Sequence, residues 1–481
     1  MFFLTIEFFA FFFLVLLLNW LLKKWPLVWR LFLLLVSYYF YWLWDFRFLG
    51  ILVVVSIFNY ILGLLIERNF WHSRRFILIC GVIANVAVLG FFKYYDFFRV
   101  SMETFLPKLG FSTNLPFLEI ILPVGISFYI FRNISYLADV AWGKIKAEKS
   151  VIDYSLFVAF FPQLLAGPIT RAGDFLSQLK NGGNRVITDF YDNITLIILG
   201  LFKKLVLSSF LVLNLTDDVF AVPQNHSAEA IFLAILAYTL VIYFDFSGYS
   251  DMAIGYSGLL GFKLPANFNT PYLATSLKDF WKRWHISLSS WIKDYIYIPL
   301  GGNRKGAFRK NFNLIFAMTI SGLWHGSAGH YIFWGFWHGV GSAFEHLFSD
   351  KSKMPMTQLN NAKTSSQIKE KLKKVFGWLA TFIFVAVGWV FFRAPSFQGA
   401  LAMLGGLFKP SNVVEAIPLL VILVTVGGLL FLFLEKPAST GFNRLQARLP
   451  FALWLVIIVI IFISLFNLSP QTVPPFIYFS F

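Results

Sequence analysis

The sequence predicts an all-α polytopic membrane protein with about eleven transmembrane helices and additional re-entrant or interfacial helices. Apolar runs of about 18 residues or more, each long enough to cross a bilayer as a helix, recur along the whole chain. Of the 481 residues, 58% are hydrophobic and 13% are charged, whereas soluble domains carry about 25% charged residues. The alternating segments of about ten residues that are typical of membrane β-barrels do not occur in the sequence.

The first four helices are expected at about 2–22, 27–44, 48–66 and 76–92. The loops after the first and the third helix are rich in lysine and arginine, so the positive-inside rule places both loops in the cytoplasm and the N-terminus outside. The first apolar run lacks a basic leading region and a small-residue cleavage site. We therefore interpret it as a retained helix rather than a signal peptide.

The next part of the chain departs from simple spans. Residues 93–117 are expected to form an outer loop with few charges. The run 156–171 offers only about 13 apolar residues before a Gly-Pro pair, which is short for a span and suits a re-entrant segment buried in protein. Asp245 and Asp251 do not share a helical face, so we interpret them as partners of nearby cations rather than as an acid/base pair.

The remaining helices are expected at about 190–216, 229–256, 312–328, 331–348, 375–393, 414–434 and 451–468. The polar stretch 349–374 carries seven lysines and few aromatic residues, and it is predicted to be a flexible cytoplasmic loop. No soluble domain and no clean internal repeat is found in the sequence. Residues 1–481 are therefore predicted to form a single membrane domain.

The net charge of +16 does not indicate a nucleic-acid partner. Roughly 31 of the 40 lysines and arginines lie in alternate loops, as the positive-inside rule requires. Membrane topology explains the basic composition, and no nucleic-acid binding is expected. The single cysteine, Cys80, lies in an apolar run, so it allows neither an internal disulfide nor a cysteine-based metal site.

Five of the seven histidines lie between residues 285 and 346, and three of them, His285, His325 and His338, directly follow a tryptophan. Placed on one helix, residues 276–292 form an apolar stripe with the lysines beside it, which predicts an interfacial helix. His285 falls at the border of this stripe. It is either an ordinary interfacial histidine or a site residue, and the spacing leaves both interpretations open.

His325 is the stronger candidate because it lies in the motif SGLWHG beside an apolar helix. Burial there favours a neutral imidazole, which is a competent general base near neutral pH. The neighbouring Gly322 and Gly326 are expected to let a substrate approach closely. His330 and His338 do not share a helical face with His325, so a histidine-only metal site is not predicted.

The segment PLGGNRKGAFRK, residues 299–310, is glycine-rich and basic. Such a segment can present backbone N–H groups and cations to phosphate groups, which makes Arg304, Lys305, Arg309 and Lys310 candidate phosphate-binding residues. The segment lacks the P-loop pattern. An ordinary cytoplasmic turn that obeys the positive-inside rule is therefore the alternative interpretation.

The runs DFSGYSDMAIG, FWKRWHIS, YIPLGGNRKG, SGLWHG and WGFWHG resemble the membrane-bound O-acyltransferase (MBOAT) family over nearly the whole chain. The sequence is most similar to the bacterial branch of alginate and peptidoglycan O-acetyltransferases. The resemblance implies that 276–345 is the catalytic core of an O-acyltransferase, with His325 as the base or acyl-handling residue and His285 as a second active-site residue. Further candidates for substrate binding are Trp324, His338, Arg304 and Lys305.

The resemblance also implies acetyl-CoA as a cytoplasmic acyl donor, with no bound cofactor or metal. It implies a periplasmic or extracellular acetyltransferase partner, a cell-envelope polysaccharide as acceptor, and a place in the bacterial inner membrane. Two alternatives stay open. The chain is a D-alanyl or longer-chain O-acyltransferase of the same family, or it is a transporter or export channel whose histidines only line the path.

Overall fold

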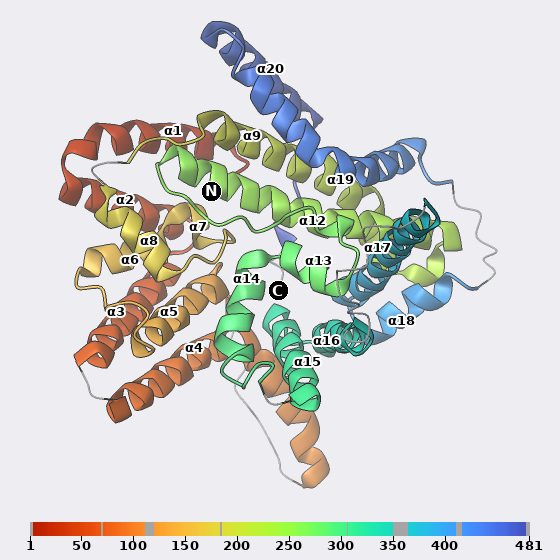
Figure 1. Cartoon of the computed structure of the whole chain (residues 1–481), viewed down its shortest axis with the longest axis horizontal. Helices are drawn as coiled ribbons and strands as arrows, with labels where there is room; N and C mark the ends of the chain where they lie inside the picture. The colour runs from red at the N-terminus through yellow and green to blue at the C-terminus, as the bar shows by residue number, and fades with distance from the viewer. Residues whose placement is uncertain are drawn as a thin grey trace. The chain divides into compact units, whose positions relative to one another are not determined.

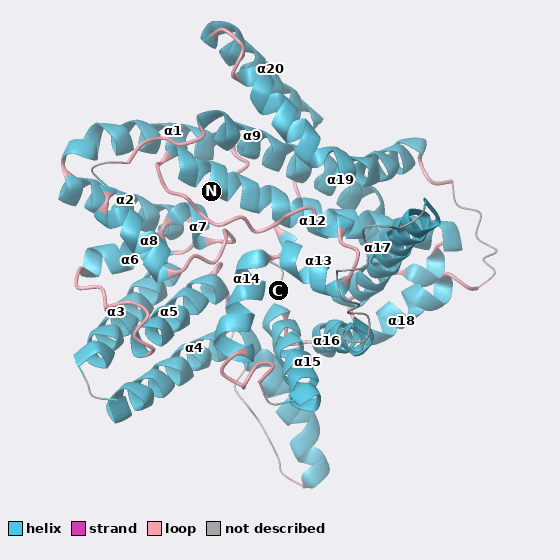
Figure 2. Ribbon diagram, in the orientation of Figure 1, coloured by secondary structure: helices cyan, strands magenta, loops and turns pink. Residues whose placement is uncertain are grey.

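The structure is a computed structural model that describes residues 3–68, 71–110, 120–182, 185–304, 306–349, 364–409 and 416–477. These described residues form helices, turns and loops and contain no strand (Figure 2). Eight of the helices are long and apolar enough to span a membrane, which confirms the predicted all-α polytopic membrane protein. They are α1 (Ile6–Leu21), α3 (Phe46–Arg68), α4 (Trp71–Phe105), the helical run from α9 (Phe190–Leu201) to α11 (Asp217–Ala221), α12 (Ala228–Leu259), α17 (Thr364–Arg393), α19 (Leu419–Gln446) and α20 (Phe451–Leu468).

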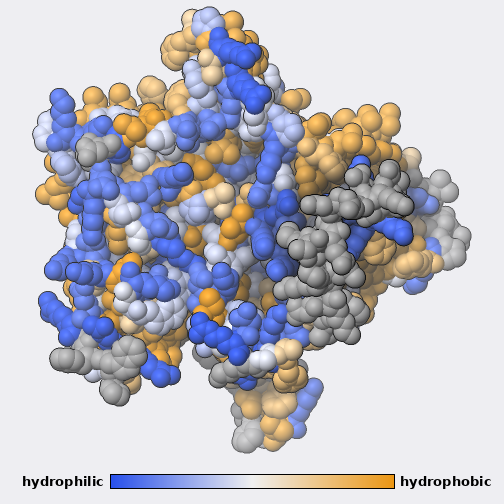
Figure 3. Space-filling model, in the orientation of Figure 1, coloured by the Kyte–Doolittle hydropathy of each residue, from blue (hydrophilic) through white to orange (hydrophobic). Residues whose placement is uncertain are grey.

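The other three expected helices are also present within the described residues. They are α2 (Pro26–Trp42), α15 (Gly306–His325) and α16 (Gly329–Ser349). Apolar side chains face outward on the spans, which is typical of a surface that meets lipid hydrocarbon rather than water. On α19 and α20, for example, Leu419, Leu430 and Ile460 are 69%, 59% and 56% exposed. Figure 3 shows hydrophobic surface of this kind beside hydrophilic surface on the face in view.

The chain divides into two compact units, whose helices are labelled in Figure 1. Unit 1 comprises Met1–Ile197 and Tyr249–Pro265. Within it α5 (Ile126–Ala141) is buried along nearly its whole length and packs against α3 and α4. The run 156–171 is broken into α6 (Val151–Ala159) and α7 (Phe161–Leu164), followed by irregular backbone.

Residues 153–170 of this broken segment are all buried, as expected for irregular backbone held inside protein. The side chain of Gln163 bonds the segment internally. Its Nε2 donates to the Phe157 carbonyl at 2.9 Å, and its Oε1 accepts from the Thr170 hydroxyl at 2.7 Å. Local polar groups thus satisfy backbone that has left the helical pattern.

Two expected loops are shorter than predicted. Residues 93–105 continue α4, and residues 111–117 of the predicted loop 93–117 lie outside the described residues. The helices α16 and α17 extend into the predicted loop 349–374, of which 350–363 lie outside the described residues. Ion pairs one helical turn apart support both extensions: Arg99 bonds Glu103 at 2.9 Å, and Lys374 bonds Glu370 at 2.9 Å. Polarity favoured a loop at the sequence level, but lysine and glutamate are also strong helix formers.

Unit 2 comprises Ile198–Gly248 and Ala266–Phe481, and it contains a tight hairpin of α15 and α16. The two helices meet at glycines. A Cβ atom on Gly335 would lie 2.3 Å from the Met318 carbonyl oxygen, and one on Gly322 would lie 2.3 Å from the Tyr331 carbonyl oxygen. Such close backbone contact requires small residues, as in other packed membrane helices.

We expect Gly335→Leu to lower the free energy of unfolding by about 1–3 kcal/mol, because the side chain must push backbone atoms apart. Thermal unfolding in detergent measures this effect. Gly329→Ala, on the same helix, is the matched control, since a Cβ at that position meets nothing within 4 Å. Equal melting temperatures for the two variants would show that the close approach of α15 and α16 is not required.

Candidate functional site

His285 lies at a break in the chain that the sequence did not reveal. The expected single helix over 276–292 is instead α13 (Leu277–Arg283) followed by α14 (Ile286–Ile292). His285 lies between them with φ 41° and ψ 55°, a left-handed conformation that is rare for residues other than glycine. Its side chain is 1% exposed. A buried polar residue in a strained conformation is typical of a functional site.

Asn267 fixes both the backbone and the ring of His285. Its carbonyl accepts the backbone N–H of Ile286 at 2.9 Å, and its Oδ1 lies 3.0 Å from His285 Nδ1. The same Oδ1 accepts the hydroxyl and the backbone N–H of Ser287 at 2.9 and 3.3 Å. Because an N–H group only donates, this atom must be the amide oxygen. His285 therefore carries its proton on Nδ1 and has a lone pair on Nε2.

His325 ends α15 and is 4% exposed. Its ring lies among aromatic rings, with centroid distances of 4.6 Å to Trp324, 5.0 Å to Trp334 and 5.0 Å to Phe392. Trp324 also lies 6.2 Å from the ring of His285. The structure thus brings His285, Trp324 and His325 together in one cluster.

His338 joins the cluster through Trp334. It is fully buried, and its ring centroid lies 5.1 Å from both Trp281 and Trp334. His330 does not belong to this cluster. Its Nδ1 donates to the Phe391 carbonyl at 2.9 Å, and the residue lines a different cavity. No group of three or more His, Cys, Asp or Glu side chains within the described ranges is arranged to hold a metal ion.

An apolar cavity of about 340 Å³, here called the lysine-rimmed cavity, lies beside this cluster within unit 2. Its wall includes Trp281 and Ser321, and Ser321 is one helical turn before His325 on α15. Three cations also line it: Lys278, Lys282 and Lys293. The cavity therefore combines an apolar wall with positive charge, which suits a ligand with an uncharged arm and an anionic head.

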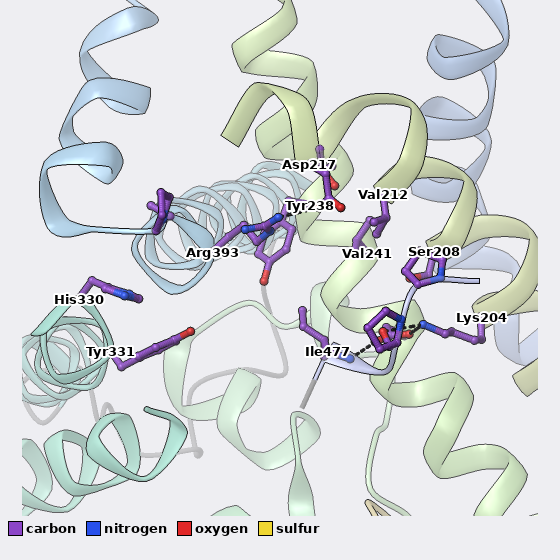
Figure 4. A pocket seen from close by; sticks show the side chains of 16 residues that line it. Lys204, Ser208, Val212, Asp217, Tyr238, Val241, His330, Tyr331, Arg393 and Ile477 are labelled. Carbon is purple, nitrogen blue, oxygen red and sulfur yellow. Dashed lines mark hydrogen bonds and ion pairs between the residues drawn. The ribbon is translucent and has the colours of Figure 1, made fainter. Parts of the chain in front are cut away.

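A second cavity of about 390 Å³, here called the polar cavity, also lies within unit 2 (Figure 4). The hydroxyls of Tyr238 and Tyr331 point into it in Figure 4. Its charges occur in pairs, since Lys204 lies 2.5 Å from Asp245 and Arg393 lies 2.6 Å from Asp217. Other wall residues are Ser208, Thr216, His330 and the C-terminal residues Pro474, Pro475 and Ile477. The prediction that Asp245 pairs with a cation is confirmed.

Aromatic rings connect each cavity to His325. Trp281 lines the lysine-rimmed cavity and contacts Trp334, with 5.9 Å between the ring centroids, and Trp334 contacts His325. From the polar cavity, Tyr331 contacts Phe392 at 5.3 Å, and Phe392 contacts His325. His325 is thus linked through two aromatic rings to each of two chemically different cavities.

Several expected residues lie apart from this arrangement. Arg304 is exposed and lines neither cavity, and Lys305 lies outside the described residues. The expectation that Gly322 and Gly326 admit a substrate is wrong, because α16 fills that space. A Cβ on Gly326 would lie 2.4 Å from the Tyr331 ring. No signal in the sequence indicated Asn267. The three lysines of the cavity were also not predicted, although Lys278 and Lys282 lie beside the apolar stripe of 276–292.

The chain is similar in sequence to known proteins over the region that forms this site. A model of the membrane-bound O-acyltransferase family matches residues 145–388, which include the histidine cluster. The chain is 40% identical to the probable alginate O-acetylase of Pseudomonas putida, over 79% of this chain and 75% of that protein. It is 35% identical to the peptidoglycan O-acetyltransferase of Helicobacter pylori, over 88% and 78%. It is 27% identical to the teichoic acid D-alanyltransferase of Bacillus subtilis, over 73% and 90%.

Proposed function

The chain belongs to the membrane-bound O-acyltransferase family and is an O-acyltransferase, and from this premise we propose that it moves an acetyl group from cytoplasmic acetyl-CoA toward an extracytoplasmic polysaccharide. A periplasmic or extracellular partner protein completes the transfer in this proposal. The single observation that carries it is the set of aromatic contacts that links His325 both to an apolar, lysine-rimmed cavity and to a polar cavity. Each cavity has the chemistry of one substrate.

His325 is the proposed general base. It takes the proton of the attacking hydroxyl, which belongs to the acceptor or to an intermediate carrier. The hydroxyl oxygen bonds to the carbonyl carbon of the thioester, and the carbonyl oxygen becomes an oxyanion. Collapse of this intermediate breaks the C–S bond. The imidazolium of His325 returns the proton to the leaving thiolate, so the products are an ester and free CoA thiol.

His285 is the proposed orienting residue. Its Nδ1–H is held by Asn267, so Nε2 presents a lone pair that accepts a hydrogen bond. This tautomer suits an N–H or O–H donor on the substrate, such as an amide of the CoA arm. Stabilising an oxyanion would require a donor at that position, so this tautomer favours an orienting role over an oxyanion-stabilising one.

The lysine-rimmed cavity is the proposed acyl-donor site. CoA has a narrow, uncharged pantetheine arm that ends in the thioester and a head with several phosphates. The cavity offers an apolar wall that leads toward His325 and three lysines that attract anions. The positive-inside rule supports a cytoplasmic position for the segment of α13 and α14 that carries these three lysines.

The triple variant Lys278→Ala, Lys282→Ala, Lys293→Ala is expected to raise KM for acetyl-CoA about tenfold and to weaken its dependence on ionic strength. Steady-state kinetics in detergent at two salt concentrations measure both effects. The matched control, Lys371→Ala, Lys373→Ala, Lys374→Ala, removes the same charge from exposed positions on α17. An equal rise in KM in the control would show that only overall charge matters.

The polar cavity is the proposed acceptor side. Its ion pairs balance in charge, and its tyrosine, serine and threonine hydroxyls suit a hydroxyl-rich acceptor. The relatives named as alginate and peptidoglycan O-acetylating proteins are 40% and 35% identical, whereas the one named as a D-alanyltransferase is 27% identical. These identities favour acetyl over D-alanyl as the transferred group.

The decisive experiment supplies proteoliposomes of the purified protein with acetyl-CoA that carries a labelled acetyl group. With the periplasmic partner and polysaccharide on the opposite side, the proposal requires CoA thiol release on one side and labelled ester on the other. A transporter or export channel releases no CoA thiol. If polysaccharide crosses the membrane without release of CoA thiol, the chain is a transporter or export channel and the acetyl-transfer proposal is wrong.

A further inference from the structure

Trp281, Trp334 and His338 form a compact group of rings whose nitrogen atoms are buried. The ring centroids of Trp281 and Trp334 lie 5.9 Å apart. The ring of His338 contacts both tryptophans edge-on, with a centroid distance of 5.1 Å to each. The Nε1 atoms of both tryptophans and both ring nitrogens of His338 are buried and have no hydrogen-bond partner among the described residues. By contrast, the nearby Trp337 and Trp389 donate to the Phe384 carbonyl and the Tyr272 hydroxyl.

Buried polar atoms are normally paired, and a group of unpaired ones requires an explanation. An indole N–H can only donate, so the two tryptophans offer two donors and cannot act as bases. Trp281 lines the lysine-rimmed cavity, and the Trp334 ring lies 5.0 Å from His325. The donors therefore lie between the proposed acyl-donor site and the proposed base.

We infer that the indole N–H groups of Trp281 and Trp334 donate hydrogen bonds to the carbonyl oxygen of the thioester and stabilise the oxyanion that forms on it. The inference rests on the proposed function and deepens it. It also supplies the donors that the His285 tautomer does not provide. His338 is a positioning residue, since its ring packs against both indoles and is itself held by Gly388, where a Cβ would lie 2.9 Å from Nε2.

The test is Trp281→Phe and Trp334→Phe, which keep an aromatic ring and remove the N–H. Each variant is expected to lower kcat of acetyl transfer about 100-fold with little change in KM for acetyl-CoA, because the hydrogen bond strengthens as charge develops. Trp337→Phe is the matched control on the same helix; its N–H already bonds the Phe384 carbonyl at 3.2 Å, and its kcat is expected to stay within about threefold.

Replacing either tryptophan by 3-benzothienylalanine keeps the shape of the indole and lacks only the N–H, so it tests the inference even where phenylalanine impairs folding. A kcat near wild type in these variants would overturn the inference, and so would a rise in KM at unchanged kcat. Transfer by the wild-type protein in the same assay separates this failure from a failure of the proposed function. Without wild-type transfer, both would be overturned.

Discussion

His325→Ala lowers the rate of acetyl transfer by about 1,000-fold and leaves the protein folded, if the proposed mechanism holds, because a positioned general base contributes about 10²- to 10⁴-fold to such reactions. The ring lies at the C-terminal end of α15 among Trp324, Trp334 and Phe392. No other imidazole contacts both Trp334 and Phe392 among the described ring pairs. The loss should therefore appear in kcat, measured as thiol release from acetyl-CoA with the partner present.

The control for this variant is His226→Ala. His226 lies in the segment after α11, 3.7 Å from Asp218, and lines neither cavity. Its removal is expected to leave kcat within about twofold, since the residue lines neither cavity. A melting temperature in detergent checks that His325→Ala is folded. More than half of wild-type kcat in a folded His325→Ala protein would remove His325 from the role of base.

The helices were predictable because their signal is local. All eleven expected helices occur, since runs of apolar residues such as those in α12 and α20 identify a span without any knowledge of its neighbours. The loops 93–117 and 349–374 were predicted less well, because polarity alone does not distinguish a loop from an exposed helix with ion pairs such as Glu370–Lys374. Local composition thus predicts where helices are more reliably than where they end.

The site was predictable only in part. The motifs WKRWHIS and SGLWHG identified His285 and His325, but not how they meet. That arrangement depends on Asn267, which is 18 residues before His285, and on the glycine contact between α15 and α16. Hydrogen bonds from a distant segment turn the chain at His285, so a helical stripe drawn over 276–292 continues through a position where the helix is broken. Neither cavity leaves a periodic signal in the sequence.

His285→Asn is expected to lower acetyl transfer by more than about 100-fold, as misplacing a substrate by about 1 Å does. Asparagine is the informative substitution, because it adopts the left-handed conformation of residue 285 more readily than most residues and so keeps the chain turn between α13 and α14. What it removes is the ring with its lone pair at Nε2. Loss of transfer at an unchanged melting temperature would therefore show that the imidazole ring, and not the backbone conformation, is required for transfer.

Asn267→Ala should act through the same ring. It removes the oxygen that holds His285 Nδ1–H and Ser287, so a loss of about tenfold is expected, the effect of about one hydrogen bond. In the double variant Asn267→Ala, His285→Asn the losses should not add, because residues that act as a unit are non-additive. Asn214→Ala, which removes an exposed bond to the Phe210 carbonyl, is the matched control. Losses that multiply in the double variant would show that Asn267 acts independently of His285, contrary to the tautomer argument.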